Sequence, residues 1–382
     1  MFKFHYRLLH RAASAALLWF AATASAQTSA QTSEGPILIG QSGGFTGGQA
    51  EYAKDVKAGI EAAFAGANAN GGISGRPVRL VTADDGGKRE AVLVNTKKLV
   101  EVDKVLALIG YTSGAGTEGS LAYIEQARVP ILSPATGNMG IRSTPSGYLF
   151  HTRAGYADEM AKIVGHVAQL GYTRVALAYL DDVGPANLKS MQDALAVHKL
   201  KAAAVVGLNR KADDFSPQVT ALLAANPQLV VFISNAKPIV KIVQGMRAGG
   251  YGGQFATSSF SGPRVVEDLK DNARGLIMIQ VLPQPKKDHL KFQREFHADL
   301  KAVAPATKAN YTVLEGYIAG RVLVDGLKRS GATASRAQLV SALETLSDLD
   351  YGGYRIRLSR SDRSGSHFVD LGVVADGGRL VF

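Results

Sequence analysis

The alternation of short β-branched runs with longer amphipathic segments is the feature that most constrains the fold of this chain. It is typical of βαβ units, in which helices connect neighbouring strands of a parallel sheet. A first series predicts one α/β lobe, with strands at 37–39, 78–81, 105–109 and 129–132 and helices at 51–65, 90–100 and 121–127. A second series predicts another lobe, with strands at 174–179, 203–208, 229–234, 254–257 and 276–280 and helices near 158–170, 187–197, 217–225, 239–248 and 263–269.

The C-terminal part of the chain changes pattern. Residues 289–346 predict three helices, of which 311–328 is the longest, and strand-like stretches such as 367–374 follow. Helices alone do not form a third α/β lobe, so we expect them to return to the first lobe. The predicted fold class is α/β, with two doubly wound parallel-sheet lobes joined by crossover strands. We expect lobe 1 at 36–153, lobe 2 at 154–282, a return to lobe 1 at 283–350, and C-terminal strands crossing to lobe 2 at 351–382.

The N-terminus has the pattern of a secretory signal peptide. Three basic residues precede an apolar run at 12–22, and Ala24-Ser25-Ala26 has the small-x-small form of a signal peptidase site. The apolar run is shorter than the roughly 20 residues that span a bilayer. We therefore predict a signal peptide at 1–26, cleavage after Ala26, a linker at 27–35 and a periplasmic location.

Composition excludes several classes of function. The chain has no cysteine, so it has neither a disulfide framework, nor a lipid-bearing cysteine, nor a thiolate nucleophile. The predicted leader carries three basic and no acidic residues, so its removal lowers the formal charge from +11 to +8. Lys and Arg are scattered without a dense run, which argues against a nucleic-acid partner and favours a solubilising surface with mild attraction for anions.

Two glycine-rich segments resemble catalytic or cofactor motifs. Residues 40–44 match the G-x-S-x-G elbow of serine hydrolases, but only one strand precedes Ser42, whereas the elbow follows several strands. Residues 114–119 match G-x-G-x-x-G, but the next predicted strand does not end in the acid that holds a ribose. Backbone N–H groups at a glycine-rich helix start attract any small anion, including a carboxylate. We predict no cofactor.

Metal and acid–base chemistry lack support as well. The six histidines beyond the leader are spread through the chain without the spacing of zinc ligands. The doublets Asp84-Asp85 and Asp181-Asp182 each follow a predicted strand, but adjacent side chains point apart and form no dyad. The sequence therefore predicts a protein that is not an enzyme and has no metal site.

Several segments together resemble one known family, the leucine/isoleucine/valine-binding-protein-like class of type I periplasmic solute-binding proteins. Each segment is weak alone, but their order and spacing from residue 36 to the end are specific. The segments are Ile37-Leu38-Ile39-Gly40, Asn70-Gly71-Gly72-Ile73-Ser74-Gly75-Arg76, Asp84-Asp85, Leu108-Ile109-Gly110, Val129 to Gly137, Asp214-Phe215-Ser216 and Asn226-Pro227.

The resemblance implies two lobes that close on a ligand in the cleft between them and deliver it to an ABC permease in the inner membrane. It places ligand donors on Thr112, Ser113 and Gly114 after one strand and on Ala135 and Thr136 after the next. The ligand class that it implies is an amino acid or a related organic acid or amide. We expect a monomer.

The second lobe departs from the family pattern. The stretch Asp181-Asp182-Val183-Gly184 lacks the family's tyrosine, and Ser258-Ser259-Phe260-Ser261 lacks the acid that receives a ligand ammonium. Asp182, or Asp181, is the candidate replacement, because a buried cation without a counter-charge is costly. If neither serves, the ligand is an acid or amide without an amine. The sequence offers further candidates for walls or hydrogen-bonding partners of the site, namely Tyr111, Tyr156, Asn235 and Phe260.

Two alternatives stay open at this level. A periplasmic sensor that signals to a receptor kinase has the same fold, and neighbouring genes would distinguish it from a transport protein. A secreted serine hydrolase using Ser42 belongs to another class, and labelling by a fluorophosphonate would reveal it.

Overall fold

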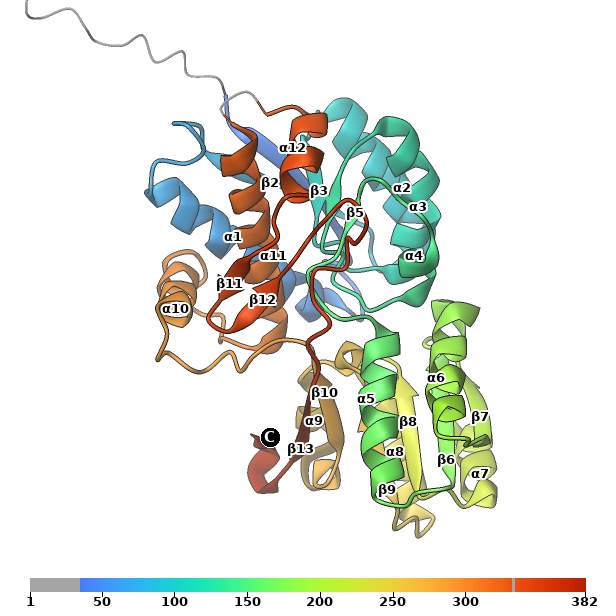
Figure 1. Cartoon of the computed structure of the whole chain (residues 1–382). Helices are drawn as coiled ribbons and strands as arrows, with labels where there is room; N and C mark the ends of the chain where they lie inside the picture. Colours follow the sequence, from blue (N-terminus) through green and yellow to red (C-terminus); the bar gives the residue numbers. More distant parts are fainter. Residues whose placement is uncertain (1–34, 332–333) are drawn as a thin grey trace, which may run out of the picture. The chain divides into compact units, whose positions relative to one another are not determined.

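The computed structural model describes residues 35–331 and 334–382, and the trace in Figure 1 follows their order. Residues 36–382 form one compact unit. The predicted signal peptide, its cleavage site and nearly all of the linker lie outside the described residues. Among the described residues, no helix combines the length and the apolar character that a membrane crossing requires.

The first sheet has five parallel strands in the order β2-β1-β3-β4-β5. After β1 the chain goes to one side of that strand, and after β2 it crosses to the other side. The point where the order reverses therefore lies between β1 and β3, and ligands bind beyond the carboxyl ends of strands at such a point. The strands are β1 (Ile37–Gly43), β2 (Val78–Asp84), β3 (Ala107–Ile109), β4 (Ile131–Leu132) and β5 (Leu149–Phe150).

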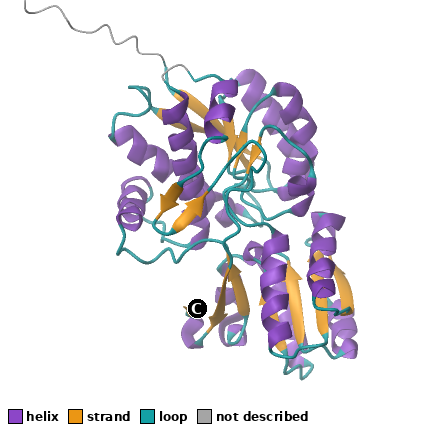
Figure 2. Cartoon of the chain, viewed as in Figure 1, coloured by secondary structure: helices purple, strands orange, loops and turns teal. Residues whose placement is uncertain are grey.

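Helices flank this sheet (Figure 2). α3 begins at Gly114 because the hydroxyl of Ser113 accepts a hydrogen bond from Gly116 N, which caps the first turn. α4 is a short helix whose first N–H groups are capped by Asn138. The connecting helices are α1 (Ala50–Ala69), α2 (Arg89–Lys97) continued by a π-helical turn (Lys98–Val102), α3 (Gly114–Ala127) and α4 (Met139–Ser143).

The second sheet has seven strands in the order β14-β13-β10-β9-β8-β6-β7. The five strands β6 to β10 are parallel, and at one edge β13 pairs antiparallel with β10 and β14 pairs antiparallel with β13. Its switch point lies between β6 and β8. The strands are β6 (Val175–Leu180), β7 (Ala202–Leu208), β8 (Leu229–Ile233), β9 (Gln254–Thr257), β10 (Ile277–Gln280), β13 (Asp370–Val374) and β14 (Leu380–Val381). The helices are α5 (Tyr156–Gln169), α6 (Pro185–Val197), α7 (Ser216–Ala225), α8 (Ala236–Ala248) and α9 (Arg264–Leu269).

Between β10 and β13 the chain returns to the helices of the first sheet. α11 packs along α1, and the contact is very close at two glycines. A Cβ on Gly59 would lie 2.0 Å from Val313 O, and a Cβ on Gly316 would lie 2.1 Å from Val56 O. Only glycine permits this approach. The returning elements are α10 (Lys291–Val303), α11 (Tyr311–Ser330), α12 (Arg336–Leu343) and the hairpin β11 (Leu349–Tyr351) and β12 (Tyr354–Ile356).

We divide the described chain into two lobes by these sheets. Lobe 1 holds the first sheet with α1 to α4, α10 to α12 and the hairpin, and lobe 2 holds the second sheet with α5 to α9. The chain passes between the lobes three times, in a first crossover (151–155), a second crossover (281–290) and a third crossover (357–369).

The predicted fold class, two α/β lobes built on parallel sheets, is confirmed. Every strand expected in the two series is present, and the three C-terminal helices are present as well. Three details differ from the prediction. α3 begins seven residues earlier than expected, the short elements α4 and β5 were not expected, and β13 runs antiparallel to both of its neighbours, β10 and β14.

Candidate functional site

The loops after β3 and β4 bring five predicted site residues together at the carboxyl end of the first sheet. Thr112 is buried, and its hydroxyl accepts a hydrogen bond from Gly44 N at 3.2 Å. A Cβ on Gly114 would lie 3.0 Å from Thr136 Oγ1, so the two loops touch. The backbone oxygen of Ala135 accepts a hydrogen bond from the Tyr52 hydroxyl at 2.7 Å. Ser113 completes the group, as the cap of α3.

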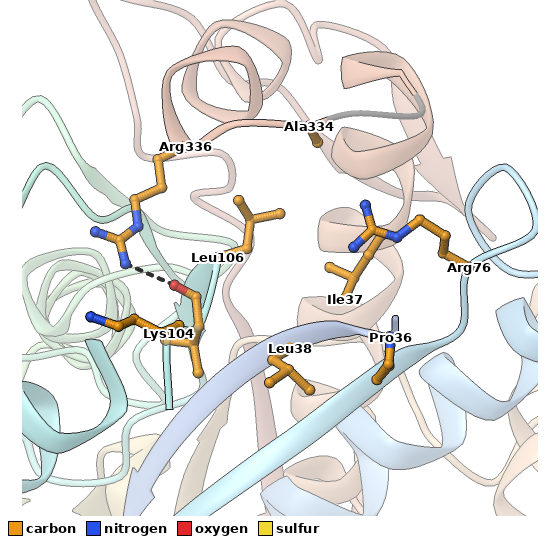
Figure 3. A pocket seen from close by; sticks show the side chains of 9 residues that line it. Pro36, Ile37, Leu38, Arg76, Lys104, Leu106, Ala334 and Arg336 are labelled. Atoms are coloured by element: carbon orange, nitrogen blue, oxygen red, sulfur yellow. Dashed lines mark hydrogen bonds between the residues drawn. The ribbon is translucent and has the colours of Figure 1, made fainter. Parts of the chain in front are cut away.

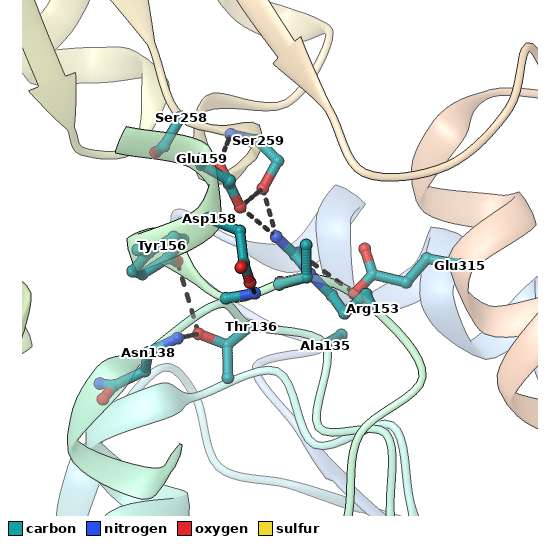
Figure 4. A network of polar contacts seen from close by, with 12 residues as sticks. Ala135, Thr136, Asn138, Arg153, Tyr156, Asp158, Glu159, Ser258, Ser259 and Glu315 are labelled. Atoms are coloured by element: carbon teal, nitrogen blue, oxygen red, sulfur yellow. Dashed lines mark hydrogen bonds and ion pairs between the residues drawn. The ribbon is translucent and has the colours of Figure 1, made fainter. Parts of the chain in front are cut away.

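Tyr156 links this group to lobe 2 (Figure 4). Its hydroxyl lies 3.4 Å from Thr136 Oγ1, and its backbone N–H donates to Gly137 O at 2.8 Å. Burial raises the pKa of Tyr156 to about 12, so the hydroxyl stays protonated and can donate. The ring of Phe260 lies 6.4 Å from the Tyr156 ring, centroid to centroid. Tyr156 and Phe260 thus form an aromatic wall beside the hydroxyl of Thr136.

Two other predicted residues lie in different surroundings. Tyr111 is fully buried inside lobe 1, and its hydroxyl lies 3.1 Å from Thr96 Oγ1. Asp182 is half exposed and forms an ion pair with Arg210, at 2.5 Å between Oδ2 and Nε. Its neighbour Asp181 is exposed. The carboxylate of Asp182 therefore already has a counter-charge within lobe 2.

Buried polar atoms without a hydrogen-bond partner mark the strand ends. Among the described residues, they include Gln41 Oε1 on β1, Asn235 Oδ1 between β8 and α8, and Ser258 Oγ directly after β9. Leaving such an atom unpaired costs about 1–3 kcal/mol, so each is a position where a ligand or water is expected to bind. Asn235 was predicted from the sequence, whereas Gln41 and Ser258 were not. Their signal was their place at the end of a predicted strand.

A buried ionic network joins the lobes at the first crossover, and it was not expected from the sequence. Arg153 Nη2 lies 2.5 Å from Glu159 Oε1 on α5, and Arg153 Nη1 lies 3.3 Å from Glu315 Oε1 on α11. Ser259 accepts a hydrogen bond from Arg153 Nη2 at 2.5 Å and donates its backbone N–H to Glu159 at 2.7 Å (Figure 4). The side chains of Arg153 and Glu159 are 2% and 0% exposed.

The charges of this network depend on one another. Burial raises the pKa of Glu159, and the Arg153 guanidinium partly offsets that rise. Burial alone would lower the pKa of Arg153, but the carboxylates of Glu315 and Glu159 raise it above its usual value. Arg153 is therefore charged at every relevant pH, and it faces two carboxylates. Tyr52 and Tyr156 belong to the same electrostatic environment.

The lobes also touch outside the network. Met139 N donates to Asn187 Oδ1 at 2.8 Å, and Asn138 Nδ2 lies 3.5 Å from Val183 O. An exposed ion pair of 2.8 Å connects Glu51 on α1 with Arg264 on α9. These contacts lie beside the strand ends that carry the candidate site residues.

Ser42 does not have the surroundings of a nucleophile. It is fully buried, so a substrate carbonyl has no access to its hydroxyl. Its hydroxyl donates to Asp85 Oδ2 at 3.0 Å and accepts from Asn95 Nδ2 at 3.1 Å. This geometry is that of a serine which fixes the loop after β2 to α2.

A pocket of about 290 Å³ lies at the other end of the first sheet (Figure 3). Ile37 begins β1 there, and Arg336 Nη2 donates to Val105 O at 2.9 Å just before β3. Lys104 and Arg76 also line it. Because ligands of doubly wound sheets bind at the carboxyl ends, and this pocket lies at the amino ends, we do not assign it to the ligand site.

Two doubly wound lobes, three crossovers and polar side chains converging at the carboxyl ends of both sheets define the class of two-lobed binding proteins. The family model described as "Periplasmic binding protein" matches residues 36–379, and the chain belongs to this family. The resemblance predicted from the sequence is thereby confirmed, and the family implies a periplasmic location.

Known relatives agree with this assignment. An "Amino acid binding protein" of Pseudomonas aeruginosa is 26% identical over 223 residues, which are 57% of this chain and 59% of that protein. A crystal structure of a substrate-binding periplasmic protein from Ralstonia solanacearum shares 30% identity, with a TM-score of 0.83 over 90% of this chain and 99% of that one. The structure of a possible leucine/isoleucine/valine-binding protein from Rhodopirellula baltica has a TM-score of 0.86 at 23% identity, over 92% and 97% of the two chains.

Proposed function

We propose that this protein is a periplasmic solute-binding protein that captures a small polar metabolite between its lobes and delivers it to an ABC importer. The observation that carries the proposal is the set of buried, unpaired polar atoms at the strand ends of both sheets, on Gln41, Asn235 and Ser258. The name of the Pseudomonas aeruginosa relative supports an amino acid or a related acid as the ligand class.

The first-lobe loops are suited to a carboxylate. Ser113 and the start of α3 direct hydroxyl and backbone donors to the end of β3, where the positive end of the helix dipole favours an anion. Thr136 and Tyr156 add two hydroxyls from the neighbouring loop and from lobe 2. We propose that these four groups surround the carboxylate or amide end of the ligand, and that Phe260 packs against its apolar part.

The amine end of a ligand has no assigned partner in this proposal. Asp182 would have to release Arg210 before it could receive an ammonium group. The proposed ligand is therefore an organic acid or amide as readily as an α-amino acid. The proposal describes a monomer without a catalytic site, and it includes removal of residues 1–26 on export.

A ligand screen tests the function. The mature protein is mixed with amino acids, keto acids, aromatic acids and amides, and its thermal unfolding is followed. A ligand at 100 times its dissociation constant adds about 2.7 kcal/mol to the free energy of unfolding, which is an easily measured shift. If no member of these classes shifts the unfolding temperature, the proposed ligand class is wrong.

A pair of variants then tests the site. Ser113→Ala and Thr136→Ala should each weaken binding of the ligand found by about 0.5–3 kcal/mol, the range for losing one hydrogen bond. Ser113→Ala also removes the cap of α3, so Ser335→Ala is the matched control, because Ser335 caps α12 and is exposed. Equal affinity in the Ser113→Ala and Thr136→Ala double variant, with the fold intact, would exclude these loops from the site.

A further inference from the structure

A second pocket, of about 520 Å³, lies in lobe 1 where the first and third crossovers run side by side. Its walls come from α4 and the loop that follows it, from the end of β5, and from the third crossover. None of its lining residues belongs to the candidate ligand site. The residues on which the inference rests are Arg142, His151, Asp362 and Arg363.

The backbone around this pocket is fixed on two sides. His151 N donates to Arg363 O at 2.8 Å, and Gly365 N donates to His151 O at 2.8 Å. These two bonds form a parallel bridge between His151 and Ser364. The pocket wall is therefore built directly on the two segments that connect the lobes.

Three basic side chains at this pocket each have a buried nitrogen without a hydrogen-bond partner within the described part of the chain. They are His151 Nδ1, Arg142 Nε and Arg363 Nε. His151 is only 4% exposed. A buried polar atom of this kind costs about 1–3 kcal/mol unless a partner is supplied, and the three residues that carry these atoms all line one cavity.

The hydrogen bonds that these arginines do form use other nitrogens of their guanidinium groups, so the Nε atoms stay unpaired. Arg142 Nη2 donates to Arg153 O at 2.8 Å, and Arg363 Nη1 donates to Arg360 O at 3.0 Å. Arg363 Nη2 also pairs with Glu344, which holds its guanidinium in position. One acidic residue, Asp362, also lines the pocket, and its Oδ1 accepts a hydrogen bond from Ser364 N at 2.8 Å.

We propose that this pocket is a second binding site, selective for a small oxyanion, which accepts hydrogen bonds from His151, Arg142 and Arg363. An oxyanion has several acceptor oxygens on one centre, which suits donors that converge from three segments of chain. Bound there, it contacts both the first and the third crossover.

The pKa of His151 provides a signature of binding. Burial lowers this pKa well below its usual value, and the charges of Arg142 and Arg153 lower it further. An anion beside the ring favours the protonated form, so occupancy of the pocket should raise the pKa of His151. The charged groups at this region are Arg142, Arg153, Arg363, Asp362 and Glu344, the last through its ion pair with Arg363.

The probes are sodium sulfate and sodium acetate at low millimolar concentration, with sodium chloride at equal ionic strength as the salt control. Isothermal titration and the histidine ring signals in NMR spectra follow binding. We expect saturable binding of sulfate, a shift of the His151 signals and a rise in its pKa. Acetate shows whether a planar carboxylate serves as well as a tetrahedral anion, and either one binding supports the site.

The variants His151→Leu and Arg363→Gln should each weaken sulfate binding at least tenfold. Arg360→Met is the matched control, because Arg360 is an exposed arginine of the same segment that does not line the pocket, and its affinity should equal that of the wild type. The inference is overturned if sulfate and acetate both leave the His151 signals unchanged, or if both variants bind as tightly as the control. Because the two sites share no residue, this result is independent of the ligand screen.

Discussion

Replacing Arg153 by methionine removes the cation that pairs with both carboxylates of the buried network at the first crossover. The side chains of Glu159 and Glu315, which are 0% and 8% exposed, would then stay buried without the counter-charge that they share. Breaking a buried ion pair by removing one partner costs about 3–5 kcal/mol, because the remaining charge stays buried and uncompensated. We expect Arg153→Met to lower the free energy of unfolding by about this amount at pH 8.

The loss should depend on pH, with a definite sign. Burial already raises the pKa of Glu159, and removal of Arg153, which now lowers it, should raise it further. A carboxyl group whose pKa is higher in the folded than in the unfolded state binds more protons when folded, so stability increases as pH falls from the folded pKa towards the unfolded value of about 4.3. Each unit of added shift corresponds to about 1.4 kcal/mol. The loss of unfolding free energy caused by Arg153→Met should therefore be smaller at pH 5 than at pH 8.

Urea unfolding followed by far-ultraviolet circular dichroism measures both effects. The single tryptophan, Trp19, lies in the predicted leader, so tryptophan fluorescence does not report on the mature chain. Arg274→Met is the matched control, because Arg274 forms an ion pair with Asp376 in which both side chains are more than 70% exposed. An exposed pair contributes about 0–1 kcal/mol. If Arg153→Met costs no more than this control, or if its deficit is the same at both pH values, the network does not stabilise the fold as described.

Three further predictions concern other parts of the molecule. Gly59→Ala should destabilise by about 1–3 kcal/mol in urea unfolding, because its Cβ would lie 2.0 Å from Val313 O, whereas the control Gly165→Ala, with no atom nearer than 3.7 Å, should be neutral or stabilising. Asp182→Asn should change ligand affinity less than threefold in calorimetry, because Arg210 already neutralises Asp182; a loss above tenfold would show that it holds a ligand ammonium. The intact mass of the exported protein should equal that of a chain that begins at Gln27. A mass equal to that of the chain beginning at Met1 would refute the cleavage prediction.

The fold was predictable because its signals are local and repeated. Buried parallel strands appear as short β-branched runs, and each flanking helix shows its own apolar period. The elements that escaped prediction lack such a signal. β5 has two residues and α4 has five, which is too short for a period. The antiparallel direction of β13 follows from its pairing with β10, nearly a hundred residues earlier, and no local pattern encodes it.

The start of α3 shows where local reasoning stops. Its first turn, from Gly114, consists of small residues without an apolar stripe, so periodicity placed the helix at 121. The cap on Ser113 decides the actual start, and that cap was visible only as a serine before a glycine-rich segment. The same serine was predicted as a ligand donor because it follows a strand. Because α3 begins close to the end of β3, Ser113 both caps the helix and lies where a ligand is predicted to bind.

The network around Arg153 was beyond sequence reasoning for a different reason. Arg153 meets Glu159 across six residues, Ser259 across 106 and Glu315 across 162, and the two long-range contacts exist only because the crossovers bring the lobes together. In the sequence Arg153, Glu159 and Glu315 are ordinary charged residues on or beside predicted helices, where a solvated position is the usual outcome. Burial converts them into a group whose parts cannot be removed singly without an uncompensated charge. The strand-end residues and the buried charges therefore differ in kind: topology alone places the former, whereas only the complete tertiary structure identifies the latter.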